Sequence, residues 1–301
     1  MNAMNSDSVT IRVPASTSNL GPGFDTLGIA LHLHNFIRVT RVPGRGIDIV
    51  SPIDEEARRG ATAMIAEAAA LFFRRSREKP FAFDVSLRGE IPIARGLGSS
   101  VTVRLGVMAA LNELAGAPFS RENLLEIVSA LEHHPDNAAP AVFGGFCVAG
   151  MLQQSVRCVH FPLTEKARFV TLIPRFEIST ERARQLVPAT FSKADTLHNL
   201  NRAALLSAAF ARGDFESVRG MFEDRVHQPY RKKLIPQLSR VIRAGEKAGA
   251  LGGWLSGSGS TIICLAFGNT EIIGRAMQRQ LPDSDVKILR SDARGMERVK
   301  S

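Results

Sequence analysis

The residues best suited to chemistry form the glycine-rich stretch Gly96-Leu97-Gly98-Ser99-Ser100. An alternating apolar run at 81–87 precedes it and predicts a strand, and apolar residues spaced by three or four, from Val101 to Leu111, predict a helix after it. The first backbone N–H groups of a helix have no partner within the helix, and its dipole places partial positive charge at the same end. The stretch therefore predicts a phosphate-binding turn.

Two standard phosphate motifs do not fit this turn. A P-loop needs Gly-Lys-Ser/Thr and no lysine is present, while the dinucleotide fingerprint needs a third glycine where Val101 stands. The hydroxyl of Ser100 can ligate Mg²⁺ or merely cap the helix. Arg104 lies one turn further on the same face, so it can contact a phosphate, although an exposed arginine is the commoner outcome.

A carboxylate in the next predicted helix, which Ser120 caps, is a second candidate. At 100° per residue, Glu132 lies about 40° from the apolar residue Val128, whereas Glu126 lies about 160° away. Glu132 therefore points inward and needs a partner. That partner is either Mg²⁺ or an arginine in an ion pair.

Histidines occur in two different settings. The loop His133-His134-Pro135-Asp136-Asn137 is dense in polar side chains and enters a buried apolar run, which makes it a better site candidate than an isolated histidine. His32 and His34 alternate along a predicted strand with no carboxylate pattern around them. We expect them to be strand residues rather than metal ligands.

Two further stretches are rich in small residues. The run at 14–25 interrupts the alternation of a first strand, and within it Asn19 and Asp25 either bind a small polar molecule or belong to a hairpin connection. The Gly/Ser-rich turn at 256–260 is either a tight bend or a second wall of the phosphate site. Between them, a second αβ pattern begins at Arg168, with helices predicted at 195–212, 215–226 and 234–247.

The composition is that of a globular protein long enough for two domains: 301 residues, 45% hydrophobic and 22% charged, with a net charge of +9. The basic residues are scattered and aromatic residues are few, so we expect an anionic nucleotide rather than nucleic acid. Cys147, Cys158 and Cys264 lack metal spacing, which favours a reducing compartment. No apolar run reaches the roughly 18 residues of a membrane span, and residues 1–8 are polar. We expect a cytoplasmic protein without a membrane partner.

Three motifs in order resemble those of the GHMP kinases, small-molecule kinases named for galactose, homoserine, mevalonate and phosphomevalonate. They lie at 14–25, at 92–100 as Pro-x-x-x-Gly-Leu-Gly-Ser-Ser, and at 255–260 as a Ser-Gly-Ser-Gly turn. Within the family, the chain is most similar to the members that phosphorylate L-homoserine. That similarity rests on 18–25, on 134–137, on Thr180 followed by Arg184, and on 228–236.

The resemblance implies an α+β, two-domain GHMP kinase fold. A ribosomal-S5-like N-terminal domain that binds ATP would span 1–165, and a ferredoxin-like C-terminal domain would span 166–301. ATP and substrate would bind in the cleft between them, and we expect the chain to act as a homodimer.

The resemblance also implies a function: ATP-dependent phosphorylation of the side-chain hydroxyl of L-homoserine, with Mg²⁺ as cofactor. MgATP would be held by Pro92, Arg95, Gly96, Leu97, Gly98, Ser99, Ser100 and Ser258, and Ser100 and Glu132 would bind the metal. Asn19, Asp25, His134, Asn137, Thr180, Arg184 and Arg231 would bind the amino acid, with the two arginines on its carboxylate. The hydroxyl proton would leave to Asp25, to Asp136 or to the transferred phosphate itself.

Two departures from the family pattern keep alternatives open. The glycine-rich turn is followed by Val101-Thr102-Val103-Arg104 where small residues are usual, and His133 replaces a usual glycine. The alternatives are another GHMP kinase, of the threonine or mevalonate type, and a non-catalytic ligand sensor of the same fold.

Overall fold

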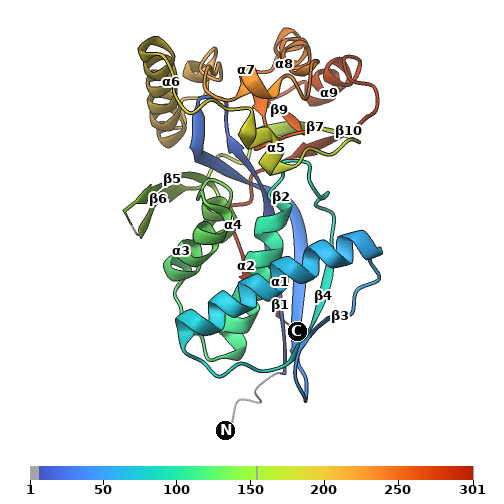
Figure 1. Ribbon diagram of the computed structural model, residues 1–301. Helices are drawn as coiled ribbons and strands as arrows, with labels where there is room; N and C mark the ends of the chain where they lie inside the picture. Colours follow the sequence, from blue (N-terminus) through green and yellow to red (C-terminus); the bar gives the residue numbers. More distant parts are fainter. Residues whose placement is uncertain (1–6, 154, 301) are drawn as a thin grey trace.

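The computed structural model describes residues 7–153 and 155–300, which form two β-sheets with their helices (Figure 1). The first sheet contains β1 (Ser8–Asn19), β2 (Gly23–Arg41), β3 (Ile47–Ile49), β4 (Phe83–Gly89), β5 (Phe146–Leu152), β6 (Ser155–Phe161) and β11 (Glu297–Arg298). Its helices are α1 (Glu55–Ser76), α2 (Ser99–Leu114), α3 (Arg121–Glu132) and α4 (Ala138–Phe143). The second sheet contains β7 (Arg168–Pro174), β8 (Gly252–Leu255), β9 (Ile262–Ala266) and β10 (Ser284–Leu289). With it lie α5 (Thr180–Gln185), α6 (Lys193–Arg212), the 3₁₀ turn η1 (Glu216–Val218), α7 (Gln228–Arg231), α8 (Leu238–Lys247) and α9 (Thr270–Gln278).

The first sheet is organised around β1, β2 and α2. The strand order is β11-β1-β2-β4-β3, and β5 and β6 continue from β2. The long strand β2 pairs with β1 along one edge and with two strands along the other, because residues 27–29 pair with β5 and residues 35–41 pair with β4. Gly106 of α2 lies against Ile37 of β2, so closely that an added Cβ would lie 2.6 Å from Ile37 Cγ1. The helices α1–α4 lie on one side of this sheet (Figure 1), and α2 is buried between them and the strands.

The second sheet has the order β10-β7-β9-β8, with all neighbours antiparallel. This is the strand order of a βαββαβ ferredoxin-like unit, which confirms the predicted class of this half of the chain. The last strand does not stay in this sheet, because β11 pairs with β1 at Ile11 and Arg12. The two sheets with their mixed helices confirm the α+β class.

A shared apolar cluster joins the two sheets, and its largest members are Phe146, Phe169, Phe210, Phe222 and Trp254. The rings of Phe146 and Phe210 stack at 4.7 Å, and those of Phe222 and Trp254 stack at 5.0 Å. Aromatic packing of this kind fixes the relative position of the layers that it joins. The two sheets therefore share part of one apolar core.

The run of small residues at 14–25 contains a hairpin connection, as one of the two alternatives predicted. β1 continues to Asn19 and β2 begins at Gly23, so only the connection between them turns. The small hydroxyl side chains at 16–18 are fully buried and are satisfied by hydrogen bonds, as when Trp254 Nε1 donates to Thr17 Oγ1 at 2.9 Å. A strand can therefore pass through this region without the apolar alternation that usually marks one.

The helix predictions in the second half are of mixed quality. The helix predicted at 195–212 is confirmed by α6, which ends at Gly213. The helix predicted at 215–226 is wrong, because only the short turn η1 forms there. Instead, the carboxylate of Asp224 accepts hydrogen bonds from the backbone N–H groups of residues 226–228, which closes a turn. The helix predicted from 234 begins four residues later, at Leu238. Among the described residues, no helix has the length and apolarity needed to cross a membrane.

Candidate active site

The glycine-rich turn lies where the first sheet meets the second. Gly98 caps α2 with a φ of 72°, and α2 begins at Ser99. Gly96 also has a positive φ, and an added Cβ there would lie 2.1 Å from the carbonyl oxygen of Ser256. Only glycine fits both the conformation and this close approach. The unpaired N–H groups of the α2 N-terminus are therefore available for an anion.

The Gly/Ser-rich turn at 256–260 lies directly against the glycine-rich turn at 96–100. This contact agrees with the alternative that predicted a second wall of the same site rather than an isolated bend. Ser256 Oγ donates to the carbonyl oxygen of Gly96 at 2.6 Å, and Thr261 N donates to the carbonyl oxygen of Arg95 at 3.1 Å. The Arg95 guanidinium donates to the carbonyl oxygen of Pro174 at 2.9 Å and pairs with Glu177 at 3.0 Å. Arg95 thus ties the turn to the second sheet.

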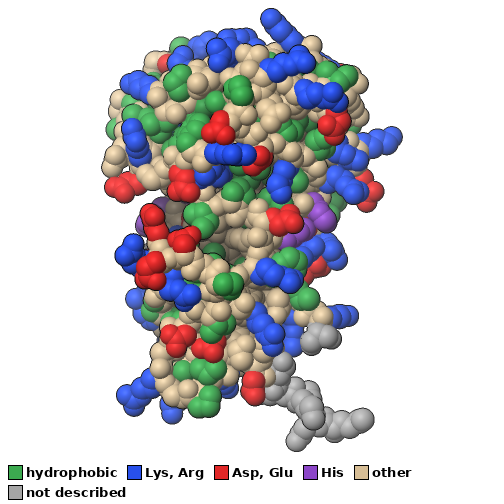
Figure 2. Space-filling view, turned by 90° about the vertical axis from the view of Figure 1, so that its right-hand side faces the viewer, with side chains coloured by type: hydrophobic (Ala, Val, Ile, Leu, Met, Phe, Trp, Pro, Cys, Tyr) green, Lys and Arg blue, Asp and Glu red, His purple; other side chains and the backbone are tan. Residues whose placement is uncertain are grey.

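A single cavity of about 710 Å³ collects most of the predicted site residues. It lies in the cleft between the two sheets, and the space-filling view shows a recess at this waist with acidic side chains gathered at its rim (Figure 2). The predicted residues that line it are Asn19, Asp25, Arg95, Gly96, Gly98, Ser99, Ser100, Glu132, His134, Asp136, Asn137, Thr180, Arg184, Arg231 and Ser258. Pro92 and Leu97 do not line it, and Leu97 is buried in the apolar cluster between the sheets.

The hydroxyl and carboxylate expected to hold a metal are adjacent. Ser100 Oγ donates to Glu132 Oε2 at 3.1 Å, whereas Glu126 does not line the cavity. The other oxygen of Glu132 accepts from Arg104 Nη1 at 2.6 Å, and Arg104 Nη2 also bonds Glu67 at 2.8 Å. The inward carboxylate is therefore in an arginine ion pair, one of the two predicted alternatives. Its second oxygen still faces a hydroxyl inside the cavity.

The unusual start of α2 is accommodated by packing. Val101 is buried in the core, and Thr102 Oγ1 accepts a hydrogen bond from Asn35 Nδ2 at 2.8 Å. The helix is regular from its first turn, because Thr102 N donates to the carbonyl oxygen of Gly98 at 3.0 Å. The β-branched residues thus leave the backbone of the phosphate turn intact.

Polar side chains that line the cavity also bond to one another. Arg184 forms a two-pronged ion pair with Asp25, with both N–O distances at 3.0 Å. Asn19 Oδ1 accepts from the backbone N–H of Asp25 at 3.0 Å, and Asn19 Nδ2 donates to the carbonyl oxygen of Gly257 at 3.2 Å. Asn19 and Asp25 both have a positive φ, and both line the cavity. Thr180 is exposed and its hydroxyl lies 3.4 Å from that of Ser258.

Arg231 is a buried cation that faces the cavity. Its side chain is 2% exposed, and it donates to the carbonyl oxygens of Gly257 at 2.9 Å and Ala183 at 3.3 Å. Among residues 7–153 and 155–300, it forms no ion pair, and its Nη2 group donates no hydrogen bond. Burial lowers the pKa of Arg231 to about 10, although Asp25 opposes the shift. A buried unpaired charge is costly, so the arrangement suits an incoming anion.

His134 and Asp136 form a buried pair at the base of the cavity, joined between Nδ1 and Oδ1. Burial favours the neutral imidazole, but the hydrogen bond and charge of Asp136 outweigh it, and the pKa of His134 is raised. Burial likewise opposes ionisation of Asp136, yet its bond to His134 leaves the pKa of Asp136 lowered. Both groups therefore favour their charged forms.

The structure adds residues that the sequence did not single out. Ser16 Oγ donates to Asn137 Oδ1 at 2.9 Å, and Asn137 Nδ2 donates to Ser18 Oγ at 3.0 Å, which orients the Asn137 amide. The side of α1 that includes Gly60 and Met64 also lines the cavity. Ser16 and Ser18 belong to the small-residue run at 14–25, so the signal for them was present in the sequence. No local pattern distinguishes the α1 residues from an ordinary helix face.

The chain is similar to known proteins of one family over most of its length. Residues 63–145 match the family model for the GHMP kinase N-terminal domain, and residues 206–283 match that for the C-terminal domain. The chain is 36% identical over 278 residues to a homoserine kinase of Caldicellulosiruptor bescii, which covers 92% of this chain and 91% of that one. It is 40% identical over 260 residues to a homoserine kinase of Deinococcus radiodurans, with coverage of 85% and 83%.

Solved structures show the same architecture. A crystal structure of homoserine kinase from Cytophaga hutchinsonii superposes with a TM-score of 0.88 at 24% identity over 99% of both chains. A putative homoserine kinase from Listeria monocytogenes superposes with a TM-score of 0.78 at 28% identity over 97% of this chain and 99% of the other. With both family domains matched, relatives 36% and 40% identical over most of the chain, and the two-domain fold in place, this chain belongs to the GHMP kinases.

Proposed function

We propose that this chain transfers the γ-phosphoryl group of ATP to the side-chain hydroxyl of L-homoserine, giving O-phospho-L-homoserine and ADP in threonine biosynthesis. The observation that carries this proposal is one cavity lined both by a glycine-rich turn at a helix N-terminus and by a buried arginine that forms no ion pair among the described residues. The names of the relatives point to the same substrate.

The nucleotide phosphates would bind the α2 N-terminus through the backbone N–H groups of Gly98, Ser99 and Ser100. The second glycine-rich turn, which contacts the first, lines the same cavity through Ser258, and Ser258 would also contact the phosphates. Because phosphoryl transfer depends mainly on alignment and charge neutralisation, a rigid turn of this kind supplies much of what the reaction needs.

The residues present fit a Mg²⁺ ion. Magnesium prefers hard oxygen ligands, and the Ser100 hydroxyl and Glu132 carboxylate lie 3.1 Å apart beside the phosphate turn. We propose that these two residues hold it. When bound, the ion neutralises charge on the phosphate oxygens.

The amino acid would bind at the end that holds Arg184 and Arg231, which we propose contact its carboxylate. Asp25 and Asp136 would face its ammonium group, and Asn19, His134, Asn137 and Thr180 would complete the pocket. The two acidic residues already carry cationic partners, Arg184 and His134 respectively. The hydroxyl oxygen of the substrate forms the new P–O bond, the bond to ADP breaks, and the hydroxyl proton leaves to Asp25, to Asp136 or to the transferred phosphate.

We also propose that the protein works in the cytoplasm as a homodimer. Cys147, Cys158 and Cys264 are all free thiols in the structure, which suits a reducing compartment. Sedimentation at several protein concentrations tests the dimer, and a monomer at micromolar concentration would contradict it.

The substrate assignment is tested by ADP release with MgATP and a panel of acceptors: L-homoserine, L-threonine, L-serine and mevalonate. We expect release that depends on L-homoserine, with phosphorylated product in equal amount. Faster turnover of threonine or mevalonate would move the chain to another GHMP activity. Binding of ATP without turnover of any acceptor would support a ligand sensor.

A further inference from the structure

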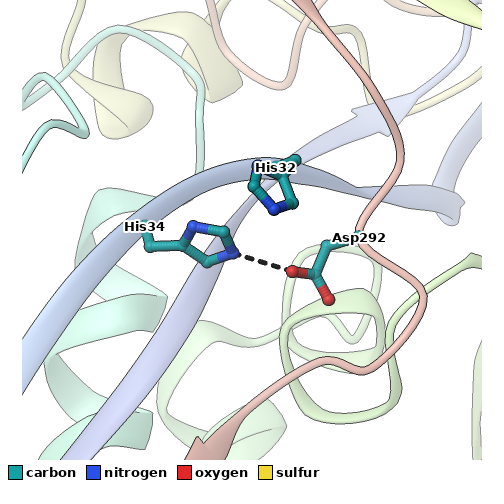
Figure 3. A group of neighbouring side chains, drawn as sticks. All are labelled: His32, His34 and Asp292. Carbon is teal, nitrogen blue, oxygen red and sulfur yellow. Dashed lines mark hydrogen bonds and ion pairs between the residues drawn. The ribbon is translucent and has the colours of Figure 1, made fainter.

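A second group of ligand side chains lies outside the active-site cavity. His32 and His34 come from β2, and Asp292 comes from the segment between β10 and β11. One donor atom of each lies within 4.8 Å of the others. Figure 3 shows a ring nitrogen of His32 directed toward the gap between His34 and Asp292, where His34 Nε2 lies 2.7 Å from Asp292 Oδ2.

The group lies on the face of the first sheet that turns away from α2. The rings of His32 and His34 lie side by side on β2, with their centroids 4.7 Å apart. Asn35 and Ile37 take the other face, where they contact Thr102 and Gly106 of α2. None of the three ligands lines the active-site cavity. The proposed kinase reaction therefore leaves this cluster without a role.

The backbone holds the carboxylate in place. Asp292 N donates to the carbonyl oxygen of Ala30 at 3.0 Å, and His32 N donates to that of Arg290 at 2.9 Å. Asp292 Oδ1 accepts from the backbone N–H groups of Arg294 at 2.9 Å and Gly295 at 3.0 Å. One carboxylate oxygen is thus fixed by backbone and the other faces the histidines. Hydrogen bonds of this kind orient ligands in metal sites.

The neighbouring charges leave room for a cation. Arg12 Nη2 lies 3.3 Å from Asp292 Oδ2, but it lies closer, 2.8 Å, to Glu297 Oε2. Arg12 therefore keeps a carboxylate partner when Asp292 takes another ligand. In a tetrahedral zinc site, bonds of about 2.0–2.2 Å separate ligand atoms by about 3.3 Å. The atoms of His34 and Asp292 need to part by only about half an ångström to reach that spacing, and the exposed His32 ring can rotate to meet them.

We propose that His32, His34 and Asp292 form a binding site for a divalent first-row transition metal ion, with Zn²⁺ the best match. Two imidazoles and one carboxylate make a nitrogen and oxygen set that suits Zn²⁺ and Co²⁺ rather than Mg²⁺. Three protein ligands leave the fourth position to water. The ion replaces the hydrogen-bonded proton between His34 and Asp292 and ties β2 to the C-terminal segment.

Metal titration of the chelator-treated full chain tests the site. We expect one equivalent of Zn²⁺ to bind by calorimetry with a Kd below about 10 μM, and Co²⁺ to give the visible absorption of a four-coordinate site. His32→Ala, at an exposed position that folding does not need, should weaken binding at least about tenfold. His34→Ala should weaken Zn²⁺ binding to a similar extent. Zn²⁺ should raise the Tm of the unmodified chain and leave the Tm of both variants unchanged.

Two matched variants control for other ligands. His160→Ala removes an exposed histidine outside the cluster, and Cys158→Ser removes the partly buried thiol. Both should bind Zn²⁺ as the unmodified chain does. Zn²⁺ binding that survives both His32→Ala and His34→Ala, or that is lost in Cys158→Ser, would overturn the proposal. So would the absence of binding at 100 times the expected Kd.

Discussion

Replacing Arg231 by methionine should weaken homoserine binding without unfolding the protein. Arg231 is buried, faces the cavity and forms no ion pair among the described residues. Removing one partner of a buried ion pair costs about 3–5 kcal/mol. At about 1.4 kcal/mol per tenfold, the KM for homoserine should rise roughly 100-fold to several thousand-fold. The kcat should change little, because the carboxylate does not take part in the transfer.

The free energy of unfolding of Arg231→Met should change little, because two effects of opposite sign act on it. The carbonyl oxygen of Ala183 loses its arginine donor, which costs about 1–3 kcal/mol for a buried acceptor left unsatisfied, whereas that of Gly257 keeps Asn19 Nδ2 as a donor. Removal of an unpaired buried charge offsets that loss. We expect the Tm of Arg231→Met to remain within about 3 °C of the unmodified chain.

The assay compares steady-state kinetics with L-homoserine and with 3-aminopropan-1-ol, which lacks the carboxylate. The Arg231→Met defect should appear with homoserine and vanish with the amino alcohol. Arg240→Met is the matched control, because Arg240 is an exposed arginine that bonds one backbone carbonyl, that of Gln280, at 3.1 Å. An unchanged KM in Arg231→Met, or equal defects with both substrates, would refute the assignment of Arg231 to the carboxylate.

Three further predictions concern the phosphate end and the buried histidine. Glu132→Gln should lower kcat/KM by at least about 100-fold. Glu126 lies outside the cavity, so Glu126→Gln should leave kcat/KM unchanged. A loss in Glu126→Gln with normal kcat/KM in Glu132→Gln would assign the metal to Glu126 instead. Arg104→Met should lower the Mg²⁺ concentration needed for half-maximal activity and tighten Mn²⁺ binding measured by electron paramagnetic resonance, because Arg104 competes for Glu132 Oε1 at 2.6 Å. Weaker Mn²⁺ binding would instead assign Arg104 a positioning role. NMR titration should place the pKa of His134 above 6.5, and Asp136→Asn should lower it. The pKa of His134 is raised in the folded state, so its contribution to the free energy of unfolding is complete below pH 6.5 and is lost as the pH rises through the folded-state pKa. Asp136→Asn should lack this pH dependence of stability. A variant that keeps the same dependence would contradict the assignment.

Local patterns in the sequence were sufficient for the elements that carry regular periodicity. The helix pattern after Ser100, the Ser120 cap and the helix at 195–212 all follow from apolar spacing and capping side chains, and the structure confirms them. The inward direction of Glu132 also follows from helix geometry alone, and it lines the cavity. These features depend on residues a few positions apart.

Features that depend on distant residues were harder to foresee. The stretch at 14–25 lacks apolar alternation, yet β1 runs through its first half because buried hydroxyl groups there have partners such as Trp254, more than 200 residues away. The predicted helix at 215–226 is replaced by a turn because Asp224 competes for backbone N–H groups. Likewise, His34 lacks a carboxylate in its own neighbourhood, and Asp292 supplies one from 258 residues further along the chain.

The central claim is that one cavity brings the γ-phosphate of ATP to the side-chain hydroxyl of L-homoserine. The most direct measurement is the ³¹P NMR spectrum of purified protein incubated with MgATP and L-homoserine. We predict that the ATP signals are replaced by those of ADP and of one phosphate monoester, coupled to the side-chain methylene of homoserine. An unchanged ATP spectrum from folded protein that binds ATP, or a monoester only when threonine or mevalonate is the acceptor, would contradict the account.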